Sequence, residues 1–285
     1  LGDPPLSIAD PEIEYLFKPS QDVSRFGNRI KYNAYSMRAD DFSLEKTNEQ
    51  ELRVLVLGDS VANGGSQTDQ SELATQLVQA RLSEQLGRPV IVGNISAGSW
   101  GPGNVLAYVK RHGLFDADVV ALVISSHDAS DVPDFKPIVD VSPDFPGTKP
   151  ALALEELIFR YLPRYLPGKA KPVESDAEEL QPKEFTAIED LEKLIQLIQE
   201  ADVPMIILQH ASRDELADGY DPGHGAIAKV AESAKVPTVE LGPSFEAAIN
   251  AGKNVYRDNI HPNAQGQAVL AEALEEAILE TLEQE

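Results

Sequence analysis

Residues 53–60 read Arg53-Val54-Leu55-Val56-Leu57-Gly58-Asp59-Ser60, a short apolar run that ends in a turn. From this stretch onward the chain repeats one pattern: a β-branched apolar run, a turn with Gly, Ser or Asn, and a longer amphipathic segment. Short apolar runs that alternate with helical segments are typical of a parallel sheet covered by helices. The pattern therefore predicts an α/β fold.

Five apolar runs predict five strands, and right-handed crossovers between them predict a flavodoxin-like, doubly wound α/β/α sandwich with the strand order 2-1-3-4-5. The predicted strands are Val54–Leu57, Val90–Val92, Val119–Ser125, Met205–Gln209 and Pro237–Leu241. The predicted helices are Ser71–Leu86, Asn104–His112, Phe185–Glu200, Gly225–Ser233 and Asn263–Leu282.

Two stretches fall outside this repeat. Residues 1–50 carry several prolines and predict an irregular N-terminal leader, or a small β element, before a domain at residues 51–285. Residues at about 130–183 form a Pro-rich insertion that is too long for a simple connection and is expected to overhang the site. Within it, Leu152–Tyr161 predicts a short amphipathic helix whose apolar spacing favours core packing over a substrate groove.

The composition excludes several classes of protein. The 24 Lys and Arg against 47 Asp and Glu give a net charge of −23, which repels nucleic acid and anionic membrane surfaces. The absence of cysteine excludes thiol catalysis, disulfides and thiolate metal sites. The longest apolar run, Val119–Ile124, is far shorter than the roughly 20 residues of a membrane-spanning helix. Because the chain begins at Leu1, we expect that an upstream piece, such as a signal or an anchor, was removed.

Ser60 is the candidate nucleophile, because it lies where a strand turns into a helix and its backbone N–H faces outward at a positive helix end. A serine needs a base to become nucleophilic. Asp258 and His261 stand three residues apart, just before the last predicted helix. With that spacing the carboxylate can accept from the imidazole Nδ1–H, which leaves Nε2 free to take the Ser60 proton.

Two further segments are expected at the same rim, because open parallel sheets place ligands beyond the carboxyl ends of their strands. Gly98 and Trp100 follow the second strand, where a glycine lets backbone N–H groups approach a reacting oxygen. His127 follows the third strand and offers a ring N–H as an oxyanion donor. Asp59 is interpreted as shaping the turn at the nucleophile. The sequence therefore predicts an oxyanion and substrate site made of Gly98, His127, Asp59 and Trp100.

Over about residues 53–282 the chain resembles the SGNH or GDSL-like hydrolases. Gly58-Asp59-Ser60-Val61 is similar to their GDS(L) block, and Asp258-Asn259-Ile260-His261-Pro262 is similar to their DxxH block. Their second block supplies a glycine N–H to the oxyanion hole, which matches Gly98, with Gly101 as the next choice. Their third block, G-x-N-D, departs here: Ser125 replaces the glycine and His127 replaces the asparagine that normally donates to the oxyanion.

The resemblance implies a carboxylic ester hydrolase with a triad of Ser60, His261 and Asp258, and with no metal or other cofactor. It also implies a small-molecule or glycan acyl ester as substrate, and the first 50 residues resemble leaders of SGNH proteins that act outside the cytoplasm. Two alternatives stay open. One is an O-acetyltransferase that acts on an extracellular glycan with the same triad. The other is a binding module that the His127 replacement has silenced.

Overall fold

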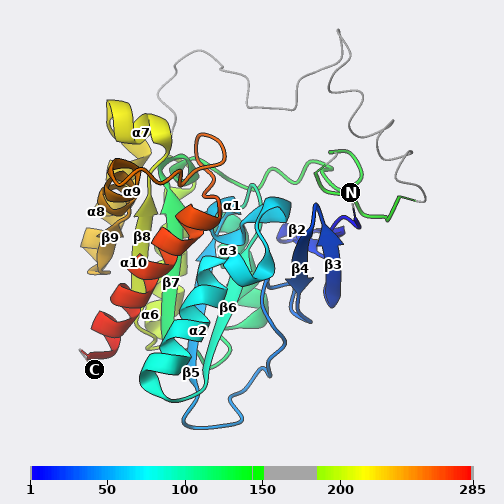
Figure 1. Cartoon of the computed structure of the whole chain (residues 1–285), viewed down its shortest axis with the longest axis horizontal. Helices are drawn as coiled ribbons and strands as arrows, with labels where there is room; N and C mark the ends of the chain where they lie inside the picture. Colours follow the sequence, from blue (N-terminus) through cyan, green and yellow to red (C-terminus); the bar gives the residue numbers. More distant parts are fainter. Residues whose placement is uncertain (1, 143, 151–184, 284–285) are drawn as a thin grey trace.

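The computed structural model describes residues 2–142, 144–150 and 185–283 (Figure 1). The central strands are β5 (Leu52–Gly58), β6 (Val90–Ser96), β7 (Val119–Ser125), β8 (Met205–His210) and β9 (Thr238–Glu240). They form a 5-stranded, all-parallel sheet in the order β6-β5-β7-β8-β9. Counted along the chain this order is 2-1-3-4-5, so the predicted α/β topology is confirmed.

Helices cover both faces of this sheet (Figure 1). They are α2 (Ala74–Leu86), α3 (Pro102–His112), α6 (Ile188–Glu200), α8 (Pro222–Ala234), α9 (Gly242–Asn250) and α10 (Ala264–Glu283). Successive strand residues point to opposite faces. In β5, Leu55 and Leu57 therefore pack in one apolar cluster with α3, α6 and α8, whereas Val54 and Val56 pack in another with α2, α9 and α10.

The five helices predicted between and after the strands are present, with small shifts at their ends, but two further helices and part of a strand differ from the prediction. Residues 93–96, expected as a loop, continue β6, because they pair with β5 and the Asn94 side chain is satisfied by the carbonyl of Ala62 at 2.9 Å. The helices α7 (Arg213–Asp218) and α9 were not predicted. For α7 the signal was present: Ser212 and Glu215 form a reciprocal capping box.

The N-terminal segment forms two β-hairpins that pack against the sheet domain. Strand β1 (Ser7–Asp10) pairs with β2 (Glu14–Phe17), and β3 (Gln21–Arg25) pairs with β4 (Asn28–Tyr32), both antiparallel. The prediction of an irregular leader is wrong for residues 7–32, and the alternative of a small β element describes them. The prolines lie before β1 and in the turns that follow β1 and β2, where no ladder N–H is lost. The division of the chain at residue 50 stays a prediction.

The first hairpin is bound to α3. The Asn104 side chain of α3 donates to the carbonyl of Ile13 at 2.8 Å, and Tyr15 belongs to the same buried apolar cluster as α3. This packing places the hairpins at the edge of the candidate site.

The Pro-rich insertion is described only in part. Its described residues, 130–142 and 144–150, contain neither strand nor α-helix. The helix predicted over Leu152–Tyr161 lies outside the described residues. Among the helices that the structure describes, none has the length and apolar character needed to cross a membrane.

Candidate active site

Ser60 opens the short helix α1 (Ser60–Asn63) directly after β5. Asp59 caps this helix, because its Oδ1 accepts from the N–H of Val61 at 2.8 Å. The turn requires Gly58, since a Cβ there would lie 2.8 Å from the carbonyl oxygen of Val123 in the neighbouring strand. The close approach of two strands thus places Ser60 beyond the carboxyl end of β5.

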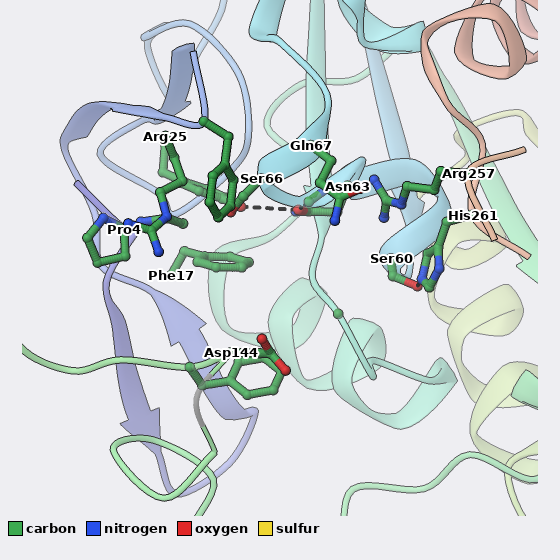
Figure 2. Close-up of a pocket in the computed structure, with 16 residues that line it drawn as sticks. Pro4, Phe17, Arg25, Ser60, Asn63, Ser66, Gln67, Asp144, Arg257 and His261 are labelled. Carbon is green, nitrogen blue, oxygen red and sulfur yellow. Dashed lines mark hydrogen bonds between the residues drawn. The ribbon is translucent and has the colours of Figure 1, made fainter. Parts of the chain in front are cut away.

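His261 connects Ser60 to Asp258. Its Nε2 lies 2.9 Å from Ser60 Oγ, and its Nδ1 lies 2.8 Å from Asp258 Oδ2. Figure 2 shows Ser60 and His261 facing each other at one end of a cavity. Because a carboxylate can only accept, Nδ1 carries the hydrogen and Nε2 is left to accept from the Ser60 hydroxyl. The three side chains are arranged as a nucleophile, a base and a group that orients the base.

Asp258 is held by its own loop. Its Oδ1 accepts from the backbone N–H of His261 at 2.8 Å and from that of Ile260 at 3.1 Å. Burial acts to raise the pKa of Asp258, but these hydrogen bonds and the His261 ring outweigh it and hold the pKa below its ordinary value. Asp258 is therefore an anion at neutral pH.

Two residues fasten this loop to the rest of the site. His210, at the end of β8, is fully buried, and its Nε2 lies 2.8 Å from the carbonyl oxygen of Ile260. Arg257 donates from its guanidinium to the carbonyl of Gly64, just after α1, at 2.8 Å. His210 lies behind the loop and does not line the cavity in front of Ser60. Arg257 was missed, although it directly precedes Asp258.

A cavity of about 350 Å³ opens in front of Ser60 and His261. Figure 2 shows Pro4, Phe17 and Arg25 on the side opposite to the two catalytic candidates. The remaining lining residues are Pro5, Phe26, Tyr32, Asn63, Gly65, Ser66, Gln67, Gly98, Asp144, Phe145 and Arg257. Asp144 and Phe145 come from the Pro-rich insertion, so its described part reaches the site, as expected.

Gly98 lines the same cavity as the candidate nucleophile. The hydroxyl of Tyr15 donates to its carbonyl oxygen, which ties this peptide to the first hairpin. Asn63 of α1 lies on the same wall and was missed by the sequence reasoning. Its Nδ2 donates to the carbonyl of Ser96 at 2.8 Å, and its Oδ1 accepts from the Tyr32 hydroxyl at 3.1 Å. Asn63 therefore links α1, the end of β6 and the second hairpin.

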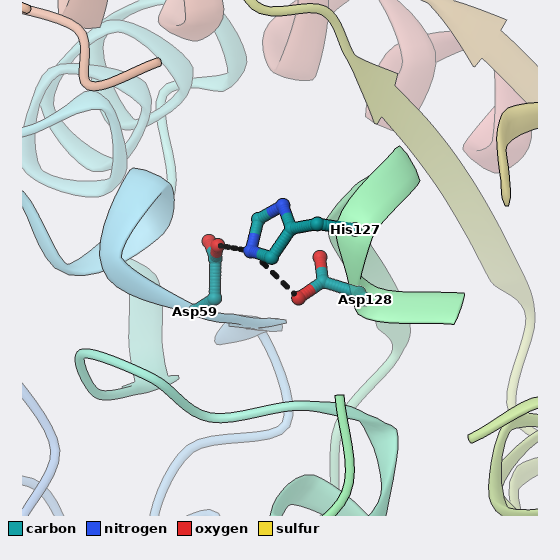
Figure 3. A group of neighbouring side chains, drawn as sticks. All are labelled: Asp59, His127 and Asp128. Atoms are coloured by element: carbon teal, nitrogen blue, oxygen red, sulfur yellow. Dashed lines mark ion pairs between the residues drawn. The ribbon is translucent and has the colours of Figure 1, made fainter. Parts of the chain in front are cut away.

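His127 lies between two buried carboxylates (Figure 3). Its Nε2 is 3.6 Å from Asp59 Oδ2 and 3.4 Å from Asp128 Oδ1, and these oxygens have no hydrogen-bond partner in the described part of the chain. The charge of Asp128 raises the pKa of His127, burial opposes it, and Asp59 adds to the rise. Burial also raises the pKa of Asp128, against the influence of His127. Because Nε2 meets the carboxylates, only Nδ1–H is left to serve an oxyanion.

Asp59, His127 and Asp128 could also hold a metal ion, since their ligand atoms lie within 4.8 Å of one another. Among the described residues they form the group with this geometry. The absence of a metal stays a prediction.

Trp100 does not line the cavity. Its buried ring packs in the core against Tyr15 and Tyr108, with ring centroids 6.3 and 6.0 Å away. The structure thus joins Ser60, His261 and Asp258 through hydrogen bonds and places Gly98 on the wall of the same cavity. Asp59, His127 and Trp100, which were predicted for the oxyanion and substrate site, do not line that cavity.

Comparisons with known proteins agree with this architecture. A sequence profile of the GDSL-like lipase/acylhydrolase family matches residues 56–269. No curated protein matches the chain. The structure of a lipolytic G-D-S-L family protein from Veillonella parvula is similar, with a TM-score of 0.50 and 13% identity over 79% of this chain and 97% of the other.

Two carbohydrate esterases of known structure are also similar. The acetyl xylan esterase AlAXEase has a TM-score of 0.52 and 15% identity, over 80% of this chain and 100% of its own. A two-domain esterase active on acetylated mannans has a TM-score of 0.53 and 14% identity, over 82% of this chain and 50% of its own. At such identities the likeness shows the fold.

Proposed function

This chain belongs to the GDSL-like lipase/acylhydrolase family and is a carboxylic ester hydrolase, and we propose that Ser60, His261 and Asp258 are its catalytic triad. One observation carries this proposal: the chain of contacts from Ser60 Oγ through the His261 ring to Asp258, at 2.9 and 2.8 Å, beside a cavity. Hydrogen-bonded in this way, the serine can be activated by a neutral imidazole whose orientation the carboxylate holds.

In the proposed reaction, Nε2 of His261 takes the hydroxyl proton while Ser60 Oγ bonds to the ester carbonyl carbon. The oxyanion that forms accepts from the backbone N–H groups of Ser60 and Gly98. The bond to the alcohol then breaks, and His261 returns the proton to the leaving oxygen. A water molecule, deprotonated by His261, attacks the acyl-serine, and the carboxylic acid and free Ser60 are released.

The substrate class we propose is a short acyl group, such as acetyl, on a small molecule or a glycan. A cavity of about 350 Å³ is at the lower end of small-ligand sites, which favours a compact ester. Two of the similar structures are an acetyl xylan esterase and an esterase active on acetylated mannans. Because such glycans lie outside the cytoplasm, we also propose an extracytoplasmic location.

Labelling with a serine-reactive organophosphonate and turnover of 4-nitrophenyl esters of increasing chain length test the proposal together. We expect one labelled residue, Ser60, located by mass spectrometry, and turnover that Ser60→Ala abolishes. Ser233→Ala, at an exposed serine of α8, is the matched control and keeps both properties. A chain that is neither labelled nor active would be a silent binding module. Net acetyl transfer to an added oligosaccharide, above hydrolysis, would identify an acetyltransferase.

A further inference from the structure

The cavity is lined by two parts of the chain, one inside and one outside the region that matches the family profile. Ser60, Asn63, Gly98 and His261 belong to the region that matches the family profile, residues 56–269. The opposite wall comes from the first 32 residues, which lie outside that match: Pro4, Pro5, Phe17, Arg25, Phe26 and Tyr32. The N-terminal hairpins therefore shape a site whose candidate chemistry resides in the sheet domain.

The tip of the second hairpin is the most exposed part of this wall. Arg25 pairs with Asn28, so Phe26 and Gly27 form a two-residue turn with φ of +54° and +91°. A bulky residue rarely adopts such a left-handed conformation, and Asn-Gly is the usual pair in this type of turn. Phe26 is also 47% exposed, and it lines the cavity. Neither turn geometry nor burial accounts for an aromatic residue at this position.

Arg25 holds the Phe26 ring in place. Its side chain is buried, donates to the carbonyl of Gly2 at 2.7 Å, and stacks with the guanidinium carbon 4.5 Å from the centre of the Phe26 ring. A second aromatic pair lines the same cavity: Phe17 stacks on Tyr32, which lies at the other end of the β3–β4 hairpin, with the ring centroids 4.2 Å apart. The hairpin side of the cavity thus presents fixed aromatic surfaces.

The part of the cavity wall that follows Ser60 in the chain is polar and contains Asn63, Ser66 and Gln67. A sugar ring carries the same two kinds of surface, with C–H groups on its faces and hydroxyls around its edge. Aromatic faces carry partial negative charge and attract such C–H groups, while side-chain amides and hydroxyls match the edge. A long acyl chain has no groups that could hydrogen-bond to this polar part of the wall.

From this juxtaposition we propose that Phe26, held by Arg25 at the tip of the β3–β4 hairpin, is a sugar-binding residue of the active site. The substrate is then an acyl ester whose alcohol is a saccharide, and the sugar ring stacks on the hairpin wall while its acyl group reaches Ser60. This inference rests on the proposed ester hydrolysis and adds the substrate class and the residue that selects it.

Phe26→Asn tests the inference, because it removes the ring and creates the Asn-Gly pair that favours this turn. The fold is therefore expected to survive with an unchanged or higher Tm. Phe135→Asn is the matched control: Phe135 is likewise exposed, at 51%, with φ of +54°, but it does not line the cavity.

We expect Phe26→Asn to lower kcat/KM for acetylated xylo-oligosaccharides at least tenfold, through KM, with a much smaller loss for 4-nitrophenyl acetate. Phe135→Asn should change neither. Equal losses on both esters, or none on the saccharide ester, would overturn the inference. So would a loss that grows with acyl chain length in a 4-nitrophenyl series, since Phe26 would then contact the acyl group.

Binding separates this inference from the proposed hydrolysis. Calorimetry on Ser60→Ala, with acetylated xylo-oligosaccharides as the probe, is expected to give a Kd that the additional Phe26→Asn change weakens at least tenfold. If the native chain cleaves no ester but this difference in Kd is found, the triad proposal fails and the sugar-binding wall stands. If 4-nitrophenyl acetate is cleaved and the saccharide neither binds nor reacts, the wall proposal fails and the hydrolase stands.

Discussion

His127 Nε2 lies 3.6 Å from Asp59 Oδ2, so the residue that precedes the candidate nucleophile forms an ion pair with the residue that replaces the asparagine of the G-x-N-D block. Asp59 follows β5 and His127 follows β7. The pair therefore links the ends of two neighbouring strands by charge attraction, directly before Ser60 in the chain. Its protonation state bears on both activity and stability.

We expect His127→Asn to remove an alkaline loss of activity. Asp128 raises the pKa of His127, burial opposes it, and Asp59, Asp131 and Glu215 add to the rise. As the pH climbs through that pKa, the ring loses one N–H donor. If the His127 ring donates to the oxyanion, kcat/KM of the wild type thus falls at alkaline pH. The carboxamide of Asn does not titrate, so kcat/KM of the variant should not fall there. Profiles from about pH 6 to 10 compare the two proteins, and identical alkaline limbs would remove His127 from the oxyanion hole.

Ser60→Ala and His261→Ala should each lower kcat by on the order of 10⁴ to 10⁶ with little change in KM, because the residues of a triad act as a unit. Steady-state kinetics on 4-nitrophenyl acetate measure both constants. A Ser60→Ala protein that keeps more than roughly a tenth of the activity has lost less than about 1.4 kcal/mol of transition-state stabilisation, and the nucleophile would then be another residue.

Asp258→Asn should cost less than the loss of His261 but still lower kcat, by up to about 10⁴, because a carboxamide cannot hold the same imidazole tautomer. The amide oxygen can still accept from the backbone N–H groups of Ile260 and His261, so the loop should keep its shape. Kinetics and thermal unfolding on the same preparation check both statements. A fall in Tm that parallels the fall in kcat would instead assign Asp258 a structural role.

His210→Phe should lower kcat while leaving KM almost unchanged. The replacement keeps an aromatic ring in the core but leaves the half-buried Ile260 carbonyl without its donor, which costs at most about 1–3 kcal/mol, the range for a fully buried group. That carbonyl lies between Asp258 and His261, so the loop would shift relative to Ser60. His210→Gln, whose amide can donate again, should restore part of kcat. Equal kcat in both variants would show that the His210 contact does not position the loop.

Asp128→Asn should stabilise the protein increasingly as the pH rises. Burial raises the pKa of Asp128, so the folded chain keeps a proton that the unfolded chain has already lost. The contribution of Asp128 to the free energy of unfolding is fully present below its pKa in the unfolded chain. It is lost as the pH rises through its pKa in the folded chain. The amide needs no proton and can still accept from the Ser125 N–H, as the carboxylate does at 2.7 Å. Urea unfolding at about pH 5 and pH 8 measures the difference, and a gain that shrinks toward pH 8 would contradict the sign.

The sheet and the candidate triad were predictable because the sequence patterns that indicate them are local. A strand needs only a short apolar run, and the right-handed twist of strands makes the crossovers between parallel strands right-handed whatever the sequence. Asp258 and His261 stand three residues apart in one loop, a distance that any tight turn can bridge. The order of the blocks along the chain therefore sufficed to propose the nucleophile, the base and the acid.

Trp100 shows where the prediction from sequence failed. It follows a predicted strand, so its position alone placed it at the rim. Whether a side chain at a strand end faces the cavity or the core depends on which elements pack against it, and here α3 and the first hairpin bury Trp100 while the 256–262 loop covers His210. That packing is set by residues far apart in the chain.

By itself the sequence determined the fold class and the strand order, and it predicted Ser60, His261 and Asp258 as nucleophile, base and acid, because these inferences depend on residue type and short spacing. Only the tertiary structure decided that Ser60 and His261, 201 positions apart, meet at 2.9 Å, and that hairpins predicted to be irregular form the far wall of the cavity. Such contacts follow from the close packing of whole elements against one another, and no local pattern encodes the distance between them.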